Sequence, residues 1–370
     1  MVNAASAPTA SGKNGSVTML DVAHHAGVAI GTVSNVLNHP DGVTPSIRDR
    51  VIASIDELGF VRNRTASKLA AGVSNTVGVV LADLDNSYFT DMVRGAEGAA
   101  SKAGKFVVVG NSDIDMSKQR SYLNYFDEEQ VSGILVAPLG GVIPPTDRHL
   151  AIRRPVVILD AARQQHAHCA VSTNNVAAGR MAAEHLLGLG RRRLIFAGGP
   201  ITRSRALADR LQGAKDAVAE VAGATLEHIP TDEVQIEGGR QVGSLLIERG
   251  ADTLPDGIVA AADLLALGIV QVLTSSSPYR FPDDVALVAC DDNRSAYDSI
   301  VPISTVDLPG REMGSVGMRL LLEELTDGDA HEHEHVTLDP TLTARESTLG
   351  RSRTPAREDE QSPIPHPVDA

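Results

Sequence analysis

The spacing of apolar residues changes once along the chain and divides it into two parts. Between residues 17 and 59, apolar positions recur at intervals of three and four, which is typical of amphipathic helices. From Thr76 onward, continuous apolar runs alternate with helical stretches, as in parallel strands that helices cover on both faces. The pattern predicts an α/β protein with a small all-α unit in front.

The first part predicts two short helices joined by a tight turn. Thr18, with Asp21 three residues later, forms a capping box that opens the first helix. Gly27 can adopt the left-handed conformation that a sharp turn requires, and a second helix over 30–37 follows at once. This arrangement is typical of a DNA-reading helix-turn-helix unit.

A third helix follows in the stretch TPSIRDRVIASIDELGF. Thr44 is its expected N-cap, Pro45 occupies its first turn and Gly59 ends it. Three short helices in one small segment complete an all-α unit.

The second part predicts two doubly wound lobes, because it is too long for a single sheet. Helical stretches such as VAAGRMAAEHLLGLG separate most of its strands, and the break between lobes is expected near residues 169–175. The expected strands are TVGVVLAD, KFVVVGNS, GILVAPL, PVVILDA, RLIFAGG, GIVAAAD, VALVACDD and HVTLDPTL.

Charge restricts where a nucleic acid could bind. The net charge is −14. Residues 1–75 carry six basic and five acidic side chains, so the rest of the chain carries −15. An acidic body repels nucleic acid, and only the front part can approach it. The first sixteen residues lack the apolar core of a signal peptide, and no apolar run could span a bilayer, so we expect a cytoplasmic protein.

Motifs for catalysis are absent from the sequence. No phosphate-binding loop, Gly-x-Ser-x-Gly elbow or His-Glu-x-x-His motif occurs, and we expect neither an enzyme nor a cofactor. Cys169 and Cys290 fit neither a disulfide framework nor a metal site with paired spacing. The run HEHEH at 331–335 has two interpretations. It is a solvated acidic loop, or its three histidines share one face as metal ligands would; we assign no metal site.

The order of these parts resembles the LacI/GalR family of repressors over some nine-tenths of the chain. The stretches that carry the resemblance include VTMLDVAHHAGVAIGTVSNVLN, VRNRTASKLAAG, TVGVVLADLDNSYFTDMVRGAE, AAGRMAAEHLLGLGRRRLIFAGGP and VALVACDDN. The family has a helix-turn-helix headpiece, a hinge and a two-lobed domain similar to periplasmic sugar-binding proteins. The implied boundaries are a disordered leader at 1–16, headpiece at 17–63, hinge at 64–75, N-terminal lobe at 76–172 plus 303–331, C-terminal lobe at 173–302 plus 335–349, and disordered tail at 350–370.

The resemblance also implies which residues contact DNA. Ile30, Gly31 and Asn35 match positions that read base edges, and Leu69 matches a hinge leucine that enters the minor groove; alternatively, Leu69 only packs on the third helix. The full implied set is Thr18, Ile30, Gly31, Thr32, Ser34, Asn35, Asn38, Thr44, Asn63, Arg64, Thr65 and Leu69. Asn pairs in bidentate fashion with adenine, so we expect an A·T pair beneath Asn35. Ala29 replaces the usual Ser/Thr N-cap, which weakens the start of the reading helix by on the order of 1 kcal/mol.

The effector-contacting positions of the family fall on Tyr88, Phe89, Asp160, Arg210 and Asp291. Aromatic faces stack on the C–H surfaces of sugars, while Arg and Asp bond neighbouring hydroxyls. Packing within the core is the alternative for the two aromatic residues. Ala262 and Cys290 depart from the family pattern, which puts a standard hexose pocket in doubt: the effector is another sugar, a sugar acid or phosphate, or another small metabolite.

The sequence thus predicts a homodimeric repressor that binds a palindromic operator in double-stranded DNA, responds to a small molecule, most simply a carbohydrate, and has no membrane partner. Two alternatives stay open. One is a two-lobed binding protein or enzyme with a vestigial headpiece; the other is a DNA-binding regulator controlled by a protein partner.

Overall fold

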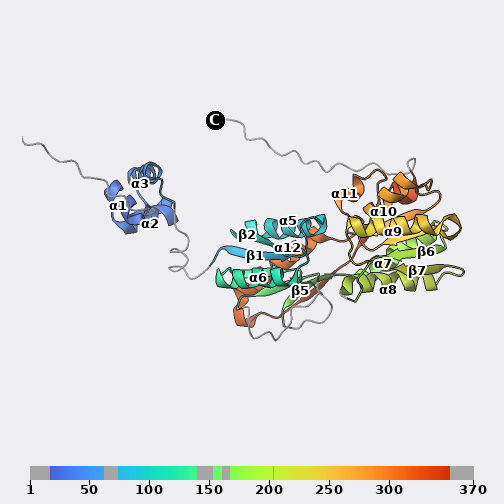
Figure 1. Cartoon of the computed structure of the whole chain (residues 1–370). Coiled ribbons are helices and arrows are strands. Elements are labelled where there is room, and N and C mark those ends of the chain that lie inside the picture. Colours follow the sequence, from blue (N-terminus) through green and yellow to red (C-terminus); the bar gives the residue numbers. More distant parts are fainter. Residues whose placement is uncertain (1–16, 62–73, 140–152, 161–166, 203, 351–370) are drawn as a thin grey trace, which may run out of the picture. The chain divides into compact units, whose positions relative to one another are not determined.

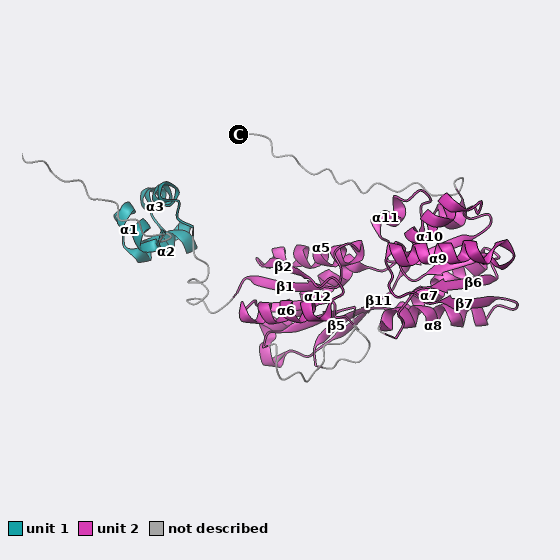
Figure 2. Ribbon diagram, viewed as in Figure 1, with its two compact units in different colours: residues 1–73 teal, residues 74–370 magenta. Residues whose placement is uncertain are grey.

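The chain forms two compact units, residues 1–73 and 74–370 (Figure 2). The computed structural model describes residues 17–61, 74–139, 153–160, 167–202 and 204–350. Each unit is described by itself.

The first unit is built from three helices around a small apolar core. They are α1 (Met19–Ala26), α2 (Ile30–Asn38) and α3 (Pro45–Leu58), with a short 3₁₀ turn, η1 (Pro40–Gly42), before α3. The core side chains are those of Val22, Ala23, Ala26, Val33, Val36 and Val51. The three predicted helices are confirmed.

Helix ends in the first unit follow the local sequence. Thr18 and Asp21 form the reciprocal capping box, and Gly27 takes the left-handed conformation at φ 62°. Gly59 ends α3 in the same way at φ 63°. Ala29 and Thr44 precede α2 and α3 without a side-chain capping bond. The weak start predicted for α2 is therefore present, whereas Thr44 does not cap with its side chain.

The second unit contains two six-stranded sheets, each with helices on both faces (Figure 1). The N-terminal sheet has the strand order β11-β5-β4-β3-β1-β2 and is parallel throughout its described pairs. Its strands are β1 (Thr76–Leu81), β2 (Phe106–Asn111), β3 (Gly133–Val136), β4 (Val156–Leu159), β5 (Cys169–Thr173) and β11 (His335–Leu338). Its helices are α5 (Ser87–Lys102), α6 (Met116–Glu128) and α12 (Gly310–Asp327).

The C-terminal sheet has the order β12-β10-β9-β8-β6-β7, and only the β10–β12 pair is antiparallel. Its strands are β6 (Arg193–Ala197), β7 (Thr225–Ile229), β8 (Gly257–Ala260), β9 (Ala286–Cys290), β10 (Ser304–Asp307) and β12 (Thr341–Thr343). Its helical elements are α7 (Asn175–Gly188), α8 (Arg205–Ala219), α9 (Ile236–Arg249), η2 (Ala251–Thr253), α10 (Asp263–Ser276), α11 (Arg294–Tyr297) and α13 (Glu346–Leu349). The short η3 (Gly328–Ala330) links α12 to β11.

The chain crosses between lobes at places that differ from the predicted boundaries. The stretch HVTLDPTL, predicted as one strand, is two strands in different sheets: β11 pairs with β5, and β12 pairs with β10. Pro340 separates them, and proline cannot donate to a strand ladder. β10 also belongs to the C-terminal sheet, so the N-terminal lobe resumes at α12 and not at residue 303.

Alternation along β1 explains how one strand serves two cores. Val77, Val79 and Leu81 belong to the cluster that α5 and α12 cover, whereas Val80 joins Phe126 of α6 on the opposite face. A Cβ on Gly78 would lie 2.4 Å from the Phe126 ring. Burial on both faces accounts for the continuous apolar runs seen in the sequence.

Paired glycines bring three helix pairs into backbone contact. A Cβ on Gly95 of α5 would lie 1.8 Å from the Arg311 carbonyl oxygen of α12, and one on Gly179 of α7 would lie 1.8 Å from the Arg210 carbonyl oxygen of α8. Gly239 of α9 meets Leu265 of α10 in the same way, at 2.0 Å. Such approaches exclude any larger residue, so Gly179 fixes the position of the Arg210 backbone.

None of the helices in the described residues is both long and apolar enough to cross a membrane.

Candidate DNA-reading face and effector site

The exposed face of α2 carries the residues predicted to read DNA. At about 100° per residue, Ile30, Gly31, Asn35 and Asn38 fall within one half of the helix surface, and all four are exposed. Val33 and Val36 on the opposite side are buried in the core. Ile30 is an apolar side chain that is 50% exposed, so it is available to contact a partner surface. The exposed face therefore presents one apolar side chain, Ile30, and two polar side chains, Asn35 and Asn38, none of which carries a formal charge.

The remaining described DNA candidates differ in how their side chains are used. Thr32 and Ser34 are half-buried on α2, and the Ser34 hydroxyl accepts from Asn38 Nδ2 at 3.2 Å. The Thr18 hydroxyl donates to Asp21 Oδ2 at 2.7 Å within the capping box, and these bonds lower the pKa of the Asp21 carboxyl. Thr44 is exposed and makes no capping bond. Asn63, Arg64, Thr65 and Leu69 lie outside the described residues.

Arg210 and Asp291 form a buried ion pair in the C-terminal lobe. Arg210 Nη1 lies 3.3 Å from Asp291 Oδ1, and both side chains are only 5% exposed. Arg210 also donates from Nε to Asn175 Oδ1 at 2.9 Å and from Nη1 to the Ala261 carbonyl oxygen at 2.5 Å. The two residues are brought together from α8 and from the end of β9.

Asn86 and Asn293 extend this pair across the boundary between the lobes. Asn86, the N-cap of α5, donates to Asp291 Oδ2 at 3.2 Å and accepts from Asn293 Nδ2 at 3.3 Å. Nearer the surface, Arg294 Nη2 bonds Asp91 Oδ1 at 2.8 Å. Asp291 is therefore shared by both lobes.

The N-terminal lobe contributes the other three predicted effector residues. Tyr88 is buried, and its ring centroid lies 5.3 Å from that of the half-buried Phe89. Its hydroxyl lies 3.7 Å from Met313 Sδ, so Tyr88 packs within the core while it borders the polar cluster. Asp160 follows β4 and is only partly exposed. Its pKa is raised by burial, while the positive charge of Arg210 acts in the opposite direction.

The backbone is strained where this cluster meets the strand ends. Asp160, Asp291 and Asp292 have φ values of 54°, 111° and 57°, in a region that residues with a side chain rarely adopt. Asp160 ends β4, and the other two follow β9. Such strain persists where the surroundings impose it, and it clusters at ligand sites.

Burial sets the charge state of the carboxylates. It raises the pKa of Asp291 to about 6, although Arg210 opposes the shift. Asp263 is completely buried, accepting from the Asn293 amide at 2.5 Å and the Thr305 hydroxyl at 2.9 Å. Burial and then the Asp291 charge raise its pKa. The carboxyls of Asp160, Asp263 and Asp291 therefore outnumber Arg210, the arginine that pairs with Asp291.

A hollow of about 520 Å³ lies beside this cluster, within the size range of ligand pockets. Both lobes contribute to it, and Gln235 Nε2 bonds Asp83 Oδ2 at 2.6 Å next to it. Its lining residues are Asp85, Gln235, Ile236, Glu237, Arg240, Leu264 and Ser295.

Four polar residues of the cluster were missed by sequence reasoning: Asn86, Asn175, Asp263 and Asn293. Three of them lie in the stretches LDN, STNN and CDDN, where polar residues follow apolar strands within five residues. Because ligands bind beyond the carboxyl ends of parallel strands, this position was the signal that could have found them.

Known proteins match this architecture over nearly its full length. The chain is 30% identical over 333 residues to the HTH-type transcriptional regulator RegA of Clostridium saccharobutylicum, an alignment that covers 89% of this chain and 98% of RegA. Residues 18–63 match the family described as bacterial regulatory proteins, lacI family, and residues 183–348 match the periplasmic binding protein-like domain. The chain belongs to the lacI family.

Two solved structures of this family resemble the chain in fold. A lac repressor dimer bound to operator and the anti-inducer ONPF superposes with a TM-score of 0.74 at 26% identity, covering 90% of this chain and all of that one. A complex of the transcriptional regulator CelR with cellobiose gives a TM-score of 0.65 at 28% identity over 90% of this chain and 99% of that one.

Membership in the lacI family gives the two units their roles. The three-helix unit is the DNA-binding headpiece, and the two-lobed unit is the effector-binding domain of a DNA-binding transcriptional regulator. The relatives are regulators and not enzymes. The headpiece keeps a packed core and a polar exposed face on α2, which argues against a vestigial unit.

Proposed function

We propose that this lacI-family protein represses transcription as a homodimer on an inverted-repeat operator and that a small polyhydroxylated metabolite, of the sugar class, controls it. The observation that carries the effector assignment is Asp291, which bonds Arg210 of its own lobe and Asn86 of the other. A ligand with adjacent hydroxyls can take over these bonds and so change how the lobes engage. CelR, with which the chain shares its fold, is known in complex with cellobiose.

Pairing of two copies is supported by an apolar edge. β2 is the outer strand of the N-terminal sheet, and its Phe106, Val108 and Val109 are 56%, 44% and 37% exposed. An exposed apolar edge strand favours association. The lac repressor of similar fold is a dimer on its operator. The protein would then work in the cytoplasm, where the operator is.

DNA reading is assigned to α2, with Asn35 as its main hydrogen-bonding reader. Asn offers both a donor and an acceptor to the N7 and N6 groups of adenine. Helix N-termini and hydroxyls hold phosphates without formal charge, while Arg48 and Arg50 supply positive charge on α3. We therefore propose one A·T pair per half-site that Asn35 specifies.

The DNA half of the proposal is tested by selecting sites from random DNA with the full chain, followed by gel shifts on the selected operator. Replacing the assigned A·T pair with G·C should weaken binding by about 1–3 kcal/mol per half-site, and Asn35→Ala should remove this preference. Indifference of the wild-type protein to that pair would refute the role of Asn35.

The effector half is tested with a panel of mono- and disaccharides in the same gel shift. Arg210→Ala should still bind the operator but lose the response to the active sugar. Arg180→Ala, which removes a partly exposed arginine paired with Glu220 on the same lobe, is the matched control and should respond normally. A full response in Arg210→Ala would place the effector elsewhere.

A further inference from the structure

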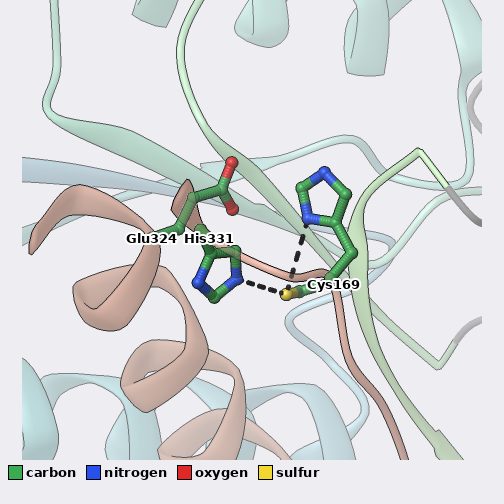
Figure 3. A group of neighbouring side chains, drawn as sticks. Cys169, Glu324 and His331 are labelled. Atoms are coloured by element: carbon green, nitrogen blue, oxygen red, sulfur yellow. Dashed lines mark hydrogen bonds between the residues drawn. The ribbon is translucent and has the colours of Figure 1, made fainter. Parts of the chain in front are cut away.

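Four side chains with metal-binding atoms meet beside β5 and β11, the outer strands on one side of the N-terminal sheet (Figure 3). Cys169 begins β5, Glu324 lies in the last turn of α12, and His331 and His333 precede β11. One ligand atom from each lies within 4.8 Å of all the others. Two segments that are distant in sequence, the start of β5 and residues 324–333, therefore converge on a single point.

The distances are close to those of a metal centre. Cys169 Sγ lies 3.0 Å from His331 Nε2 and 3.8 Å from His333 Nδ1. A tetrahedral ion with bonds of about 2.3 Å to sulfur and about 2.0 Å to nitrogen would separate these atoms by about 3.6 Å. Only small side-chain movements separate the observed arrangement from a coordinated one.

Glu324 is the fourth member of the group, and one of its carboxylate oxygens has no hydrogen-bond partner in the described part of the chain. Among the described residues, Glu324 Oε2 is buried and has no hydrogen-bond partner, which is costly for a carboxylate. Asp327 Oδ2 lies 4.0 Å from the other ring nitrogen of His331. At this distance the two groups form no hydrogen bond, and the carboxylate adds a negative charge beside the ring.

The electrostatic environment favours a cation. The backbone N–H of Glu334 donates to Cys169 Sγ at 3.3 Å, and the carboxylates of Glu324 and Glu334 lie near this sulfur. A divalent ion would compensate these negative charges and deprotonate the thiol. His333 is exposed, so an ion can reach the buried sulfur from solvent.

We propose that Cys169, Glu324, His331 and His333 bind one divalent transition-metal ion, with Zn²⁺ as the best fit. One thiolate and two imidazoles exclude Ca²⁺ and Mg²⁺, which prefer oxygen ligands. A Cys-His-His-Glu set matches the tetrahedral coordination of zinc. The third histidine of HEHEH, His335, is not part of the set, because its Nε2 lies 2.9 Å from the Ser172 hydroxyl.

The bound ion would tie α12 to the beginning of β5 and to β11. In a parallel sheet all strands begin at the same end of the sheet. β1, which follows the first unit in sequence, therefore begins at the same end as β5 and β11. The ion therefore braces the N-terminal lobe at the end of the sheet where β1 begins.

The test uses the full chain without a histidine tag, purified under reducing conditions and stripped with a chelator that is then removed. Elemental analysis after zinc addition and gel filtration should give one zinc per chain, and zinc should raise the melting temperature. With Co²⁺ as the probe, the protein should show tetrahedral d–d bands and a thiolate-to-cobalt charge-transfer band. Absence of both zinc retention and the thiolate band would overturn the proposal.

Matched variants locate the site. Cys169→Ser, His331→Asn and His333→Asn should each weaken zinc binding by at least about 100-fold, more than typical second-shell changes do. Glu324→Gln should weaken it and Glu323→Gln, its neighbour paired with Arg319, should not. His335→Asn is the control for the two ligating histidines. Equal losses in ligand and control variants, or full binding by Cys169→Ser, would refute the assignment. If Cys169→Ser does not fold, the variant of the exposed His333 decides.

Discussion

Asn86 Nδ2 in the N-terminal lobe donates to Asp291 Oδ2 in the C-terminal lobe at 3.2 Å. The other oxygen of the same carboxylate lies 3.3 Å from Arg210 Nη1. One buried carboxylate thus has one partner from each lobe, so a change in the position of one partner alters the hydrogen bond to the other. Ligands alter a two-state equilibrium only through differential affinity for the states, and this shared carboxylate is a place where such a difference can arise.

Breaking the pair on one side should be costly to the fold. Arg210→Ala leaves the Asp291 charge buried without its cation, and we expect a loss of about 3–5 kcal/mol in the free energy of unfolding. The double variant Arg210→Ala/Asp291→Ala should recover part of that loss because it removes the uncompensated charge. Urea unfolding followed by circular dichroism measures this cycle. Additive single effects would show that the two residues do not interact.

The glycine crossing beneath Arg210 gives a second prediction. Gly179→Ala would place its Cβ 1.8 Å from the Arg210 carbonyl oxygen, so α7 and α8 must move apart and carry Arg210 with them. We expect a loss of about 1–3 kcal/mol in unfolding free energy and a weakened effector response in the gel shift.

Gly188→Ala is the matched control for this variant. Gly188 lies on the same helix, and nothing lies within 4 Å of its Cβ position, so alanine should be neutral or stabilise by about 0.5–1 kcal/mol. Equal effects of the two substitutions would show that helix propensity and not the close crossing decides.

Elements with a strong local pattern could be predicted from the sequence. The helix ends at Thr18, Gly27 and Gly59 depend on neighbouring residues only, and the long apolar strands were evident from composition. The pairing of HVTLDPTL could not be predicted, because its two halves choose partners more than thirty residues away in different sheets. β5, β7 and β10 were also missed: β5 was interpreted as the break between lobes, β7 is too polar to form an apolar run, and β10 has only four residues, two of them hydroxylated.

The effector cluster and the proposed metal site show the same limit of prediction from sequence. Family resemblance placed Arg210 and Asp291, which the structure joins although 81 residues separate them. It could not supply Asn86, whose contact with Asp291 spans 205 residues. The sequence around Cys169 did not indicate a metal site, because the histidines next to it in the structure lie more than 160 residues further along the chain. Contacts of this range depend on the folded topology and not on local pattern.

The raised pKa of Asp291, about 6, predicts a specific dependence of stability on pH. A carboxyl whose folded pKa exceeds its unfolded value near 3.8 favours the folded state when protonated. Its contribution is complete below the unfolded pKa and is lost as the pH rises through about 6. Because Asn cannot ionise, Asp291→Asn should gain stability relative to the wild type over that interval.

Urea unfolding of both proteins across this pH range measures the difference, which cancels the titration of groups that do not interact with Asp291. Asp284→Asn is the control, because Arg280 holds the pKa of Asp284 below its ordinary value through hydrogen bonds and the sign should be opposite. A difference between Asp291→Asn and wild type that falls with rising pH would contradict the burial argument.

The uncapped start of α2 gives the last prediction. Ala29 has the extended backbone of an N-cap, with φ −70° and ψ 151°, but it offers no side-chain acceptor. Ala29→Thr supplies a hydroxyl for the first free amides of the helix, a gain of about 0.5–1 kcal/mol. Hydrogen exchange of the α2 amides should slow by about two- to fivefold, since local opening controls exchange. Ala29→Val has the same shape without the acceptor, and Ala29 is exposed, so valine should not slow exchange. If Thr and Val slow exchange equally, the effect comes from side-chain size and not from capping. That result would contradict the prediction that α2 lacks an N-cap acceptor.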